Sequence, residues 1–308
     1  MNLALHALKR VLWLVPLLLA VSFFAFVLVR LAPGGPFDGA RKRASPEIER
    51  ALLARYHLDE SLPRQYLRFL GGLVHGDFGA SLKYRNHTVA DLIRQGFPVS
   101  MGLGLLAFGF SLGLGIPAGV YGALHEGAWR DYLTGFLTLL AVCIPGFVLG
   151  PILVMWLGVS WGWFPVGLWD GPWHTVLPTL ALGLYFAGKV GRMVREGMRQ
   201  TLRLEFIVTA RAKGLSETRI LLRHALPMAI LPVVSYTGPL LADLLTGSFV
   251  VENLFQIPGL GVFMVNSSLS RDYPMVVGLV LLYAVLLMLL NLVVDLLYGF
   301  LDPRVRHG

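Results

Sequence analysis

Long stretches without any charged side chain constrain this chain more than any other feature. Neither Met101–Leu124 nor Tyr132–Trp169 contains Asp, Glu, Lys or Arg. A bilayer core about 30 Å thick needs about 20 apolar residues of helix, and both stretches exceed that length. Hydrophobic residues make up 56% of the 308-residue chain and charged residues only 14%, against roughly 25% charged in soluble domains. The chain is therefore predicted to be an integral membrane protein.

The apolar stretches predict an all-α fold with about six transmembrane helices. The first apolar run, Val11–Val29, follows Lys9 and Arg10. It is longer than the roughly 7–15 residues of a cleavable signal region, so it is predicted to be an uncleaved first span. The six spans are expected near residues 11–31, 99–124, 132–158, 175–195, 227–250 and 274–300.

The positive charges between these spans predict the orientation in the membrane. Lys9 and Arg10 lie at the N-terminus, Arg130 follows the second predicted span, nine Lys and Arg from Lys189 to Arg223 lie at and after the end of the fourth, and Arg304 and Arg306 lie in the C-terminal tail. In contrast, residues 161–173 contain no Lys or Arg, and residues 251–273 contain only Arg271. Because short cytoplasmic loops carry the excess of positive charge, both termini are predicted to be cytoplasmic. The net charge of +8 is thus accounted for by topology and does not indicate nucleic-acid binding.

Residues 32–98 form a long segment on the predicted outer side although they contain ten Lys and Arg. Long loops translocate largely regardless of their charge, so the topology permits this. The segment also has helical patterns, which predict a small folded periplasmic insertion above the first two spans. Ser45 can cap a helix that begins at Pro46, and a second short helix is expected over 63–74. The face of the first helix is formed by Ile48, Leu52, Leu53 and Tyr56.

Motifs of catalysis and metal binding are not supported by the sequence. Gly183, Gly188 and Lys189 match a phosphate-binding loop, but Val190 replaces the Ser or Thr, no strand precedes the match, and it lies within a predicted span. The eight histidines lack metal-ligand spacing, and the single cysteine, Cys143, cannot form an internal disulfide. The chain is predicted not to be an enzyme and to bind no nucleotide or metal itself.

Two other patterns predict packing and membrane placement. Glycines four residues apart in the second span allow neighbouring helices to approach closely: Gly109 with Gly113, and Gly115 with Gly119. Tryptophans gather at the predicted outer ends of the third and fourth spans, where amphipathic rings prefer the membrane interface. They are Trp156, Trp161, Trp163, Trp169 and Trp173.

The segment from Arg195 to Arg223 is basic, amphipathic and interrupted at Gly214-Leu215-Ser216. Ser216 can cap a second helix, in which Ile220, Leu221 and His224 share one face while Arg219 and Arg223 lie on another. One interpretation is a basic helix on anionic lipid. The other is a pair of short helices that dock into a groove of a partner protein. The residue pattern alone leaves both open.

Residues 208–227 resemble the cytoplasmic signature of ABC-importer permeases, E-A-A, three residues, G, nine residues, I-x-L-P. Ala210, Gly214, Leu226 and Pro227 fall at the matching positions, whereas Val208, Thr209 and His224 depart from the pattern. The form here is similar to that of the peptide and nickel permeases, and closest to their oligopeptide branch. Further segments with this resemblance are 30–37, His75–Gly79, Pro258–Gly261, Arg271–Tyr273 and the stretch from Asp295 to Arg304.

The resemblance implies a type I ABC-importer permease fold over residues 1–308, with the insertion at 32–98 and a cytoplasmic coupling segment at 196–226. The implied coupling residues, which contact an ATPase subunit in that family, are Thr209, Ala210, Arg211, Ala212, Lys213, Gly214, Leu215 and Ser216. Asp243, inside the fifth span, is expected to face the bundle interior because a central charge is costly in lipid. There it could either line the translocation path and meet a peptide amine or pair with a neighbouring helix. Glu252 and Asn253 resemble the external gate region of the family.

The implied partners are a second homologous permease, two ATPase subunits that carry ATP and magnesium, an external or lipid-anchored peptide-binding protein, the peptide and the bilayer of a bacterial inner membrane. The same machinery could instead import dipeptides, nickel or glutathione. A different class, a secondary transporter driven by protons or sodium, would need a central acidic site, for which Asp243 is the single candidate.

Overall fold

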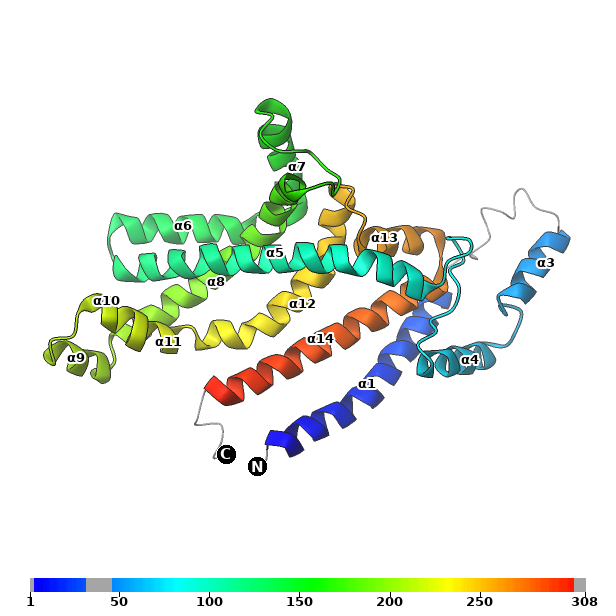
Figure 1. The fold of residues 1–308 in the computed structure, drawn as a ribbon, viewed down its shortest axis with the longest axis horizontal. Helices are drawn as coiled ribbons and strands as arrows, with labels where there is room; N and C mark the ends of the chain where they lie inside the picture. The colour runs from blue at the N-terminus through cyan, green and yellow to red at the C-terminus, as the bar shows by residue number, and fades with distance from the viewer. Residues whose placement is uncertain (1–2, 32–45, 302–308) are drawn as a thin grey trace. The chain divides into compact units, whose positions relative to one another are not determined.

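The computed structural model describes residues 3–31 and 46–301, and these residues are almost entirely helical (Figure 1). Their one β feature is an isolated bridge between Ala80 and Thr88. The predicted all-α class is confirmed. The chain forms two compact units, one from residues 101–257 with the chain from 289 on, and the other from residues 4–100 and 258–288. The long helices α5 (Val89–Leu124) and α14 (Tyr273–Leu301) contribute residues to both units.

The first unit contains the third to fifth predicted spans and the basic segment. Its elements follow α5 in the order α6 (Trp129–Cys143), α7 (Gly146–Leu153), the π-helical stretch η1 (Val154–Ser160), the short 3-10 helix η2 (Pro172–Thr175), α8 (Val176–Leu202), α9 (Glu205–Ala212), α10 (Glu217–Ile220), the π-helical stretch η3 (Leu221–Ala225), α11 (Leu226–Ala229) and α12 (Leu231–Leu254).

The second unit contains the first predicted span and the insertion. Its helices are α1 (Leu3–Leu31), α3 (Pro46–Arg55), α4 (Leu62–Val74) and α13 (Leu260–Ser270), with the adjoining parts of α5 and α14. Phe69 and Leu73 of α4 pack against the buried Ala25 of α1 and Leu281 of α14. The two predicted insertion helices are thus present, although Ser45 lies outside the described residues, as do the side chains of Ile48 and Leu52.

Within residues 3–31 and 46–301, four helices are long and apolar enough to cross a membrane, namely α1, α5, α12 and α14. The bent pair formed by α6 and α7–η1 qualifies as a fifth span if it is taken as one. The fourth predicted span corresponds to α8, whose charged residues Lys189, Arg192 and Arg195 lower its apolar content. Most of its other residues are buried, which is typical of a central helix in a bundle.

The predicted third span, 132–158, is broken. Helices α6 and α7–η1 meet at an angle of 101°. The break falls at Ile144-Pro145, where Ile144 has the extended conformation (φ −92°, ψ 112°) that a residue before proline prefers. Pro145 also has no N–H for the helical ladder. The break therefore has a local cause in the sequence.

Helix α5 begins ten residues before the predicted start of the second span. Thr88 and Asp91 form a capping box: the N–H of Thr88 donates to Asp91 Oδ2 (3.1 Å), and the N–H of Asp91 donates to Thr88 Oγ1 (3.2 Å). These bonds satisfy N–H groups that have no partner in the first turn of a helix. Because the apolar pattern starts later than this cap, hydropathy alone misplaced the boundary.

One of the two predicted glycine pairs brings α5 against α8. A Cβ at Gly115 would lie 2.7 Å from the carbonyl oxygen of Ala187, and one at Gly119 would lie 2.5 Å from that of Gly191. Such distances are shorter than van der Waals contact, so these positions need glycine. At Gly109 and Gly113 an added Cβ would have no neighbouring atom within 4 Å, and this pair plays no such role within the described chain.

Candidate functional site

The basic segment folds as two short helices joined at the predicted glycine. Gly214 has a φ of +75°, which glycine adopts without strain. Its N–H donates to the carbonyl of Arg211 (2.9 Å), and the N–H of Leu215 donates to that of Ala210 (3.3 Å). These bonds satisfy carbonyl groups at the end of α9, as in a helix C-cap whose final glycine has the left-handed conformation. The predicted split between α9 and α10 is confirmed.

Ser216 occupies the N-cap position of α10, as predicted, but its hydroxyl makes no capping bond. Its backbone carbonyl accepts the N–H of Ile220 (3.0 Å). The expected division of faces in this helix and in η3 is confirmed, since Ile220 is buried while Arg219 and Arg223 are exposed.

An ion pair spans the turn between the two helices. Arg211 donates from Nε to Glu217 Oε1 (2.7 Å) and from a terminal nitrogen to Glu217 Oε2 (3.2 Å). The hydrogen bond from Arg211 lowers the pKa of Glu217 below its usual value, and the same bond raises the pKa of Arg211. Sequence reasoning identified Arg211 but not Glu217. The signal was an acid six residues after a base, across a predicted turn.

Burial divides the segment into an anchoring face and an exposed face. Ile207, Ala210 and Ile220 are buried against the rest of the first unit, and Leu215 is partly buried. The predicted coupling residues on the other side are exposed, namely Thr209, Arg211, Ala212, Lys213, Gly214 and Ser216. Apolar side chains are also exposed there: Phe206, Val208 and Leu222. The segment thus presents a mixed basic and apolar surface on a fixed backbone.

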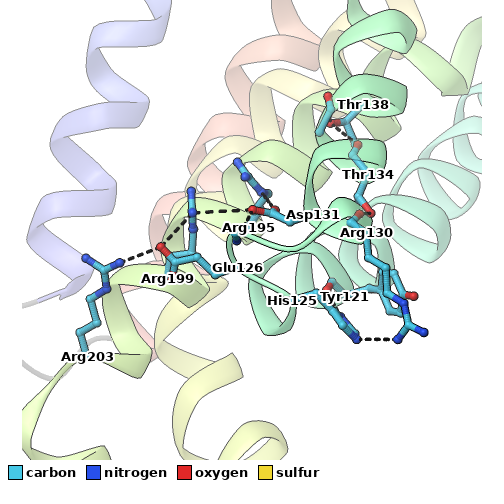
Figure 2. Close-up of polar contacts among 12 residues, drawn as sticks. Tyr121, His125, Glu126, Arg130, Asp131, Thr134, Thr138, Arg195, Arg199 and Arg203 are labelled. Carbon is cyan, nitrogen blue, oxygen red and sulfur yellow. Dashed lines mark hydrogen bonds and ion pairs between the residues drawn. The ribbon is translucent and has the colours of Figure 1, made fainter.

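A network of charges fixes the end of α8 to the start of α6 (Figure 2). Arg195 Nε donates to Asp131 Oδ1 (2.6 Å), and Asp131 is only 2% exposed. Glu126 Oε1 lies between the guanidinium groups of Arg199 (2.8 Å) and Arg203 (2.7 Å). The three arginines are four residues apart and therefore share one face of α8. Since α9 follows α8 directly, this network fixes the entry into the basic segment.

The other end of the segment returns to the same helix. A Cβ at Gly197 of α8 would collide with the carbonyl oxygen of Ala229 in α11. The segment from α9 to α11 is therefore attached to α8 at both of its ends. The sequence analysis did not identify Glu126 and Asp131, because their pairing with the arginines of α8 depends on the packing of α8 against the start of α6.

The three predicted path and gate residues do not share one surface. Asp243, in the middle of α12, and Asn253, near its end, are exposed. Glu252 is fully buried, and its carbonyl accepts the N–H of Ile257 (2.8 Å) in the turn after α12. Asp243 and Asn253 belong to an exposed or partly exposed stripe on α12, with members three, four or seven residues apart: Pro232, Tyr236, Pro239, Asp243, Val250 and Asn253.

Comparison with known proteins shows the family. The family described as "Binding-protein-dependent transport system inner membrane component" matches residues 115–307. The oligopeptide transport system permease protein OppB of Haemophilus influenzae is 42% identical over 97% of this chain and 98% of its own, and OppB of Escherichia coli K12 is also 42% identical with the same coverage. The dipeptide permease DppB of Bacillus subtilis is 38% identical over 98% of both chains.

Solved structures show the same fold. Two inward-facing crystal forms of the MetNI methionine ABC transporter align with TM-scores of 0.58 and 0.56 at 19% and 17% identity, covering 68% of this chain and 96% of theirs. The aligned fold agrees with the helical arrangement, and the range matched by the family includes the signature at 208–227. The chain therefore belongs to the binding-protein-dependent transport system inner membrane components, and it is a multi-pass permease subunit of an ABC importer.

Proposed function

We propose that this permease subunit imports oligopeptides. The observation that carries the proposal is the 42% identity to OppB over 97% of the chain. That identity exceeds the 38% to a dipeptide permease of similar coverage. Dipeptides are the second candidate, on the strength of this DppB similarity; nickel and glutathione are the remaining alternatives. Because the chain belongs to the ABC-importer family, the alternative of a secondary transporter driven by protons or sodium is set aside.

In the proposed mechanism, the exposed face of α9 and α10 docks on an ATPase subunit. Docking by short helices into a groove needs apolar anchors with a polar rim, which Phe206, Val208 and the surrounding basic residues supply. Attachment of the segment to α8 at both ends would transmit the movement of the ATPase to the transmembrane helices. The permease itself offers no energy source, and moving a two-state equilibrium from 1:99 to 99:1 requires about 5.5 kcal/mol.

The remaining partners follow from this mechanism. A second homologous permease would complete the translocation path, and two ATPase subunits would hold ATP and magnesium and carry out the hydrolysis. An external peptide-binding protein would deliver cargo to the outer loops. Both termini and the segment 196–226 would be cytoplasmic, as the distribution of Lys and Arg predicts. Asp243 and Asn253, on the exposed stripe of α12, are proposed to face the path, whereas the buried Glu252 would support the outer end of that helix.

A mild-detergent purification of the tagged chain from its native host tests this assembly. We expect an ATPase subunit and a second permease to copurify with the wild type and to be lost with Gly214→Arg. Recovery of the wild-type chain alone would contradict the proposal. The elution volume of the purified variant, compared with that of the wild-type chain, controls for misfolding.

A further inference from the structure

Two charged side chains lie far from the ends of the neighbouring helices α8 and α12. Lys189 is near the midpoint of α8, and Asp243 is near the midpoint of α12. Both belong to the first compact unit, in which the two helices contact each other. A charge inside a membrane span costs up to roughly 2.5–3.5 kcal/mol on insertion scales, and both residues lie within predicted spans, so we expect them to face a protein interior or an aqueous path. Both positions therefore call for a functional explanation.

Lys189 is surrounded by aromatic rings. Its Nζ donates to the hydroxyl of Tyr236 (3.4 Å) and lies 4.5 Å from the ring centroid of Tyr185. The rings of Tyr236 and Phe186 are 5.8 Å and 5.9 Å away. Ring faces attract a cation without neutralising it. Within the part of the chain that the structure describes, no carboxylate forms an ion pair with Lys189, and its positive charge is available to a ligand.

Asp243 follows Tyr236 on the same stripe of α12. Seven residues are two helical turns, which place the two positions about 10.5 Å apart along the helix axis. Lys189 contacts this stripe at Tyr236, so the positive group meets α12 two helical turns before the position that carries the negative group. At roughly 3.3–3.6 Å per residue, an extended chain of about three residues covers the same distance.

We propose that Lys189, with Tyr185 and Tyr236, receives the carboxylate terminus of a transported peptide, and that Asp243 receives its ammonium terminus. This inference rests on the proposal that the cargo is a peptide. A carboxylate accepts hydrogen bonds both from an ammonium group and from phenol hydroxyls, and the Lys189 cluster supplies both kinds of donor. Recognition of the two termini requires no specific contact with the peptide side chains, which suits cargo of varied sequence.

A structural role for Lys189 makes a different prediction. If the cation only joins α8 to α12 through the tyrosine rings, its removal lowers the stability of the complex and slows every cargo equally. A site for the peptide carboxylate instead makes the effect depend on whether that carboxylate is present. The ratio between two cargoes therefore separates the two roles.

The test uses the complete transporter in proteoliposomes, with the binding protein saturated by cargo. Maximal uptake is compared for a tripeptide with free termini, its C-terminal amide and its N-acetyl form. We expect Lys189→Met to reduce the preference for the free tripeptide over the amide by about tenfold, and Lys189→Arg to retain it. Asp243→Asn should reduce the preference for the free tripeptide over its N-acetyl form and leave the preference over the amide unchanged. Because all variants receive cargo from the same binding protein, its own selectivity cancels.

Tyr236→Phe removes only one hydroxyl and keeps the test open if Lys189→Met does not assemble. It should lower the same free-to-amide ratio by a smaller factor. This inference would be overturned if an assembled Lys189→Met transporter kept the wild-type free-to-amide ratio. If only Tyr236→Phe assembles, an unchanged ratio in that variant would overturn it instead. Either result would leave peptide import intact. A wild type that imports none of the peptides would overturn the proposed function and this inference together.

Discussion

Asp131, in the first turn of α6, accepts a 2.6 Å hydrogen bond from Arg195 of α8, and it is nearly inaccessible to solvent. It also accepts the backbone N–H of Gly127 (3.2 Å), so a single carboxylate fixes both the α5–α6 loop and α8. Because the basic segment begins directly after α8, this pair connects the proposed coupling surface to a transmembrane hairpin (Figure 2).

Replacing Asp131 with Asn should lower the stability of the protein by about 2 kcal/mol. The amide keeps the shape but removes the charge from a charge-assisted bond in a buried position. The thermal midpoint in detergent measures the loss. Glu196→Gln is the matched control, since Glu196 follows Arg195 on α8, is exposed and bonds only to Gln200 among its described contacts. Equal midpoints for the two variants would show that the Asp131 pair does not stabilise the fold.

Substitutions at Gly214 should reduce the coupling of peptide uptake to ATP hydrolysis. The loss should be smallest for Asn, larger for Ala and largest for Val. No atom lies within 4 Å of a Cβ at this position, so the cost comes from the positive φ and not from a clash. A left-handed conformation costs about 1–2 kcal/mol for most residues, less for Asn, and is a clear outlier for β-branched ones. Peptide uptake per ATP hydrolysed is the measurement. Similar coupling in the Asn and Val variants would contradict this account.

The Arg211–Glu217 pair should make the order of the turn between α9 and α10 depend on pH. The pKa of Glu217 is lowered in the folded protein, so the pair stabilises the turn at neutral pH. This contribution is lost as the pH falls through the folded pKa of Glu217. Hydrogen exchange of residues 205–220 should therefore differ between the wild type and Glu217→Gln at pH 7, and the difference should vanish in acid. Both side chains are exposed, so the effect should be small and weaken with salt.

Asp272 should be among the most sensitive positions of the second unit. It is fully buried, and it accepts the hydroxyl of Ser81 and the backbone N–H groups of Leu82 (3.1 Å) and Lys83 (3.3 Å). Asp272→Ala leaves these donors unsatisfied, which should cost about 3 kcal/mol or more.

Two measurements check the prediction for Asp272: the thermal midpoint, and the rate of proteolysis within residues 75–88. Asp77→Ala is the control, because its carboxylate is exposed and accepts a bond from Gly79 within the same loop. A control that is destabilised as strongly as Asp272→Ala would refute the prediction.

Hydropathy and charge predicted the membrane class and the approximate position of each apolar helix, because these depend on composition over about 20 residues. The helix starts and breaks depend instead on single residues. Thr88 and Asp91 begin α5 ahead of its apolar run, and Pro145 breaks the third span within an apolar run. The capping pattern and the proline are both visible in the sequence, but a hydropathy average over about 20 residues does not detect either of them.

The split of the basic segment at Gly214 was predictable because a glycine followed by a capping residue is a local pattern. The partners of that segment were not. Asp131 is 64 residues away from Arg195, and Tyr236 is 47 residues away from Lys189. The sequence presents Lys189 as part of a phosphate-loop match and of the basic run at the end of the fourth predicted span, and only the packing of α8 on α12 shows its aromatic surroundings. Such pairs depend on tertiary contacts that no spacing rule gives.

The most direct test of the account measures ATP hydrolysis and tripeptide uptake in the same proteoliposomes, for the wild-type complex and for Ala210→Arg. Ala210 is buried on the anchoring face of α9, so an arginine there would displace α9 and the docking surface that it carries from the rest of the first unit. We predict uptake that requires ATP in the wild type and loss of uptake in the variant, whose purified permease still elutes like the wild type. Normal coupled uptake by Ala210→Arg would contradict the coupling role of this segment. Wild-type uptake that survives ATP depletion and collapses with the ion gradient would contradict the mechanism as a whole.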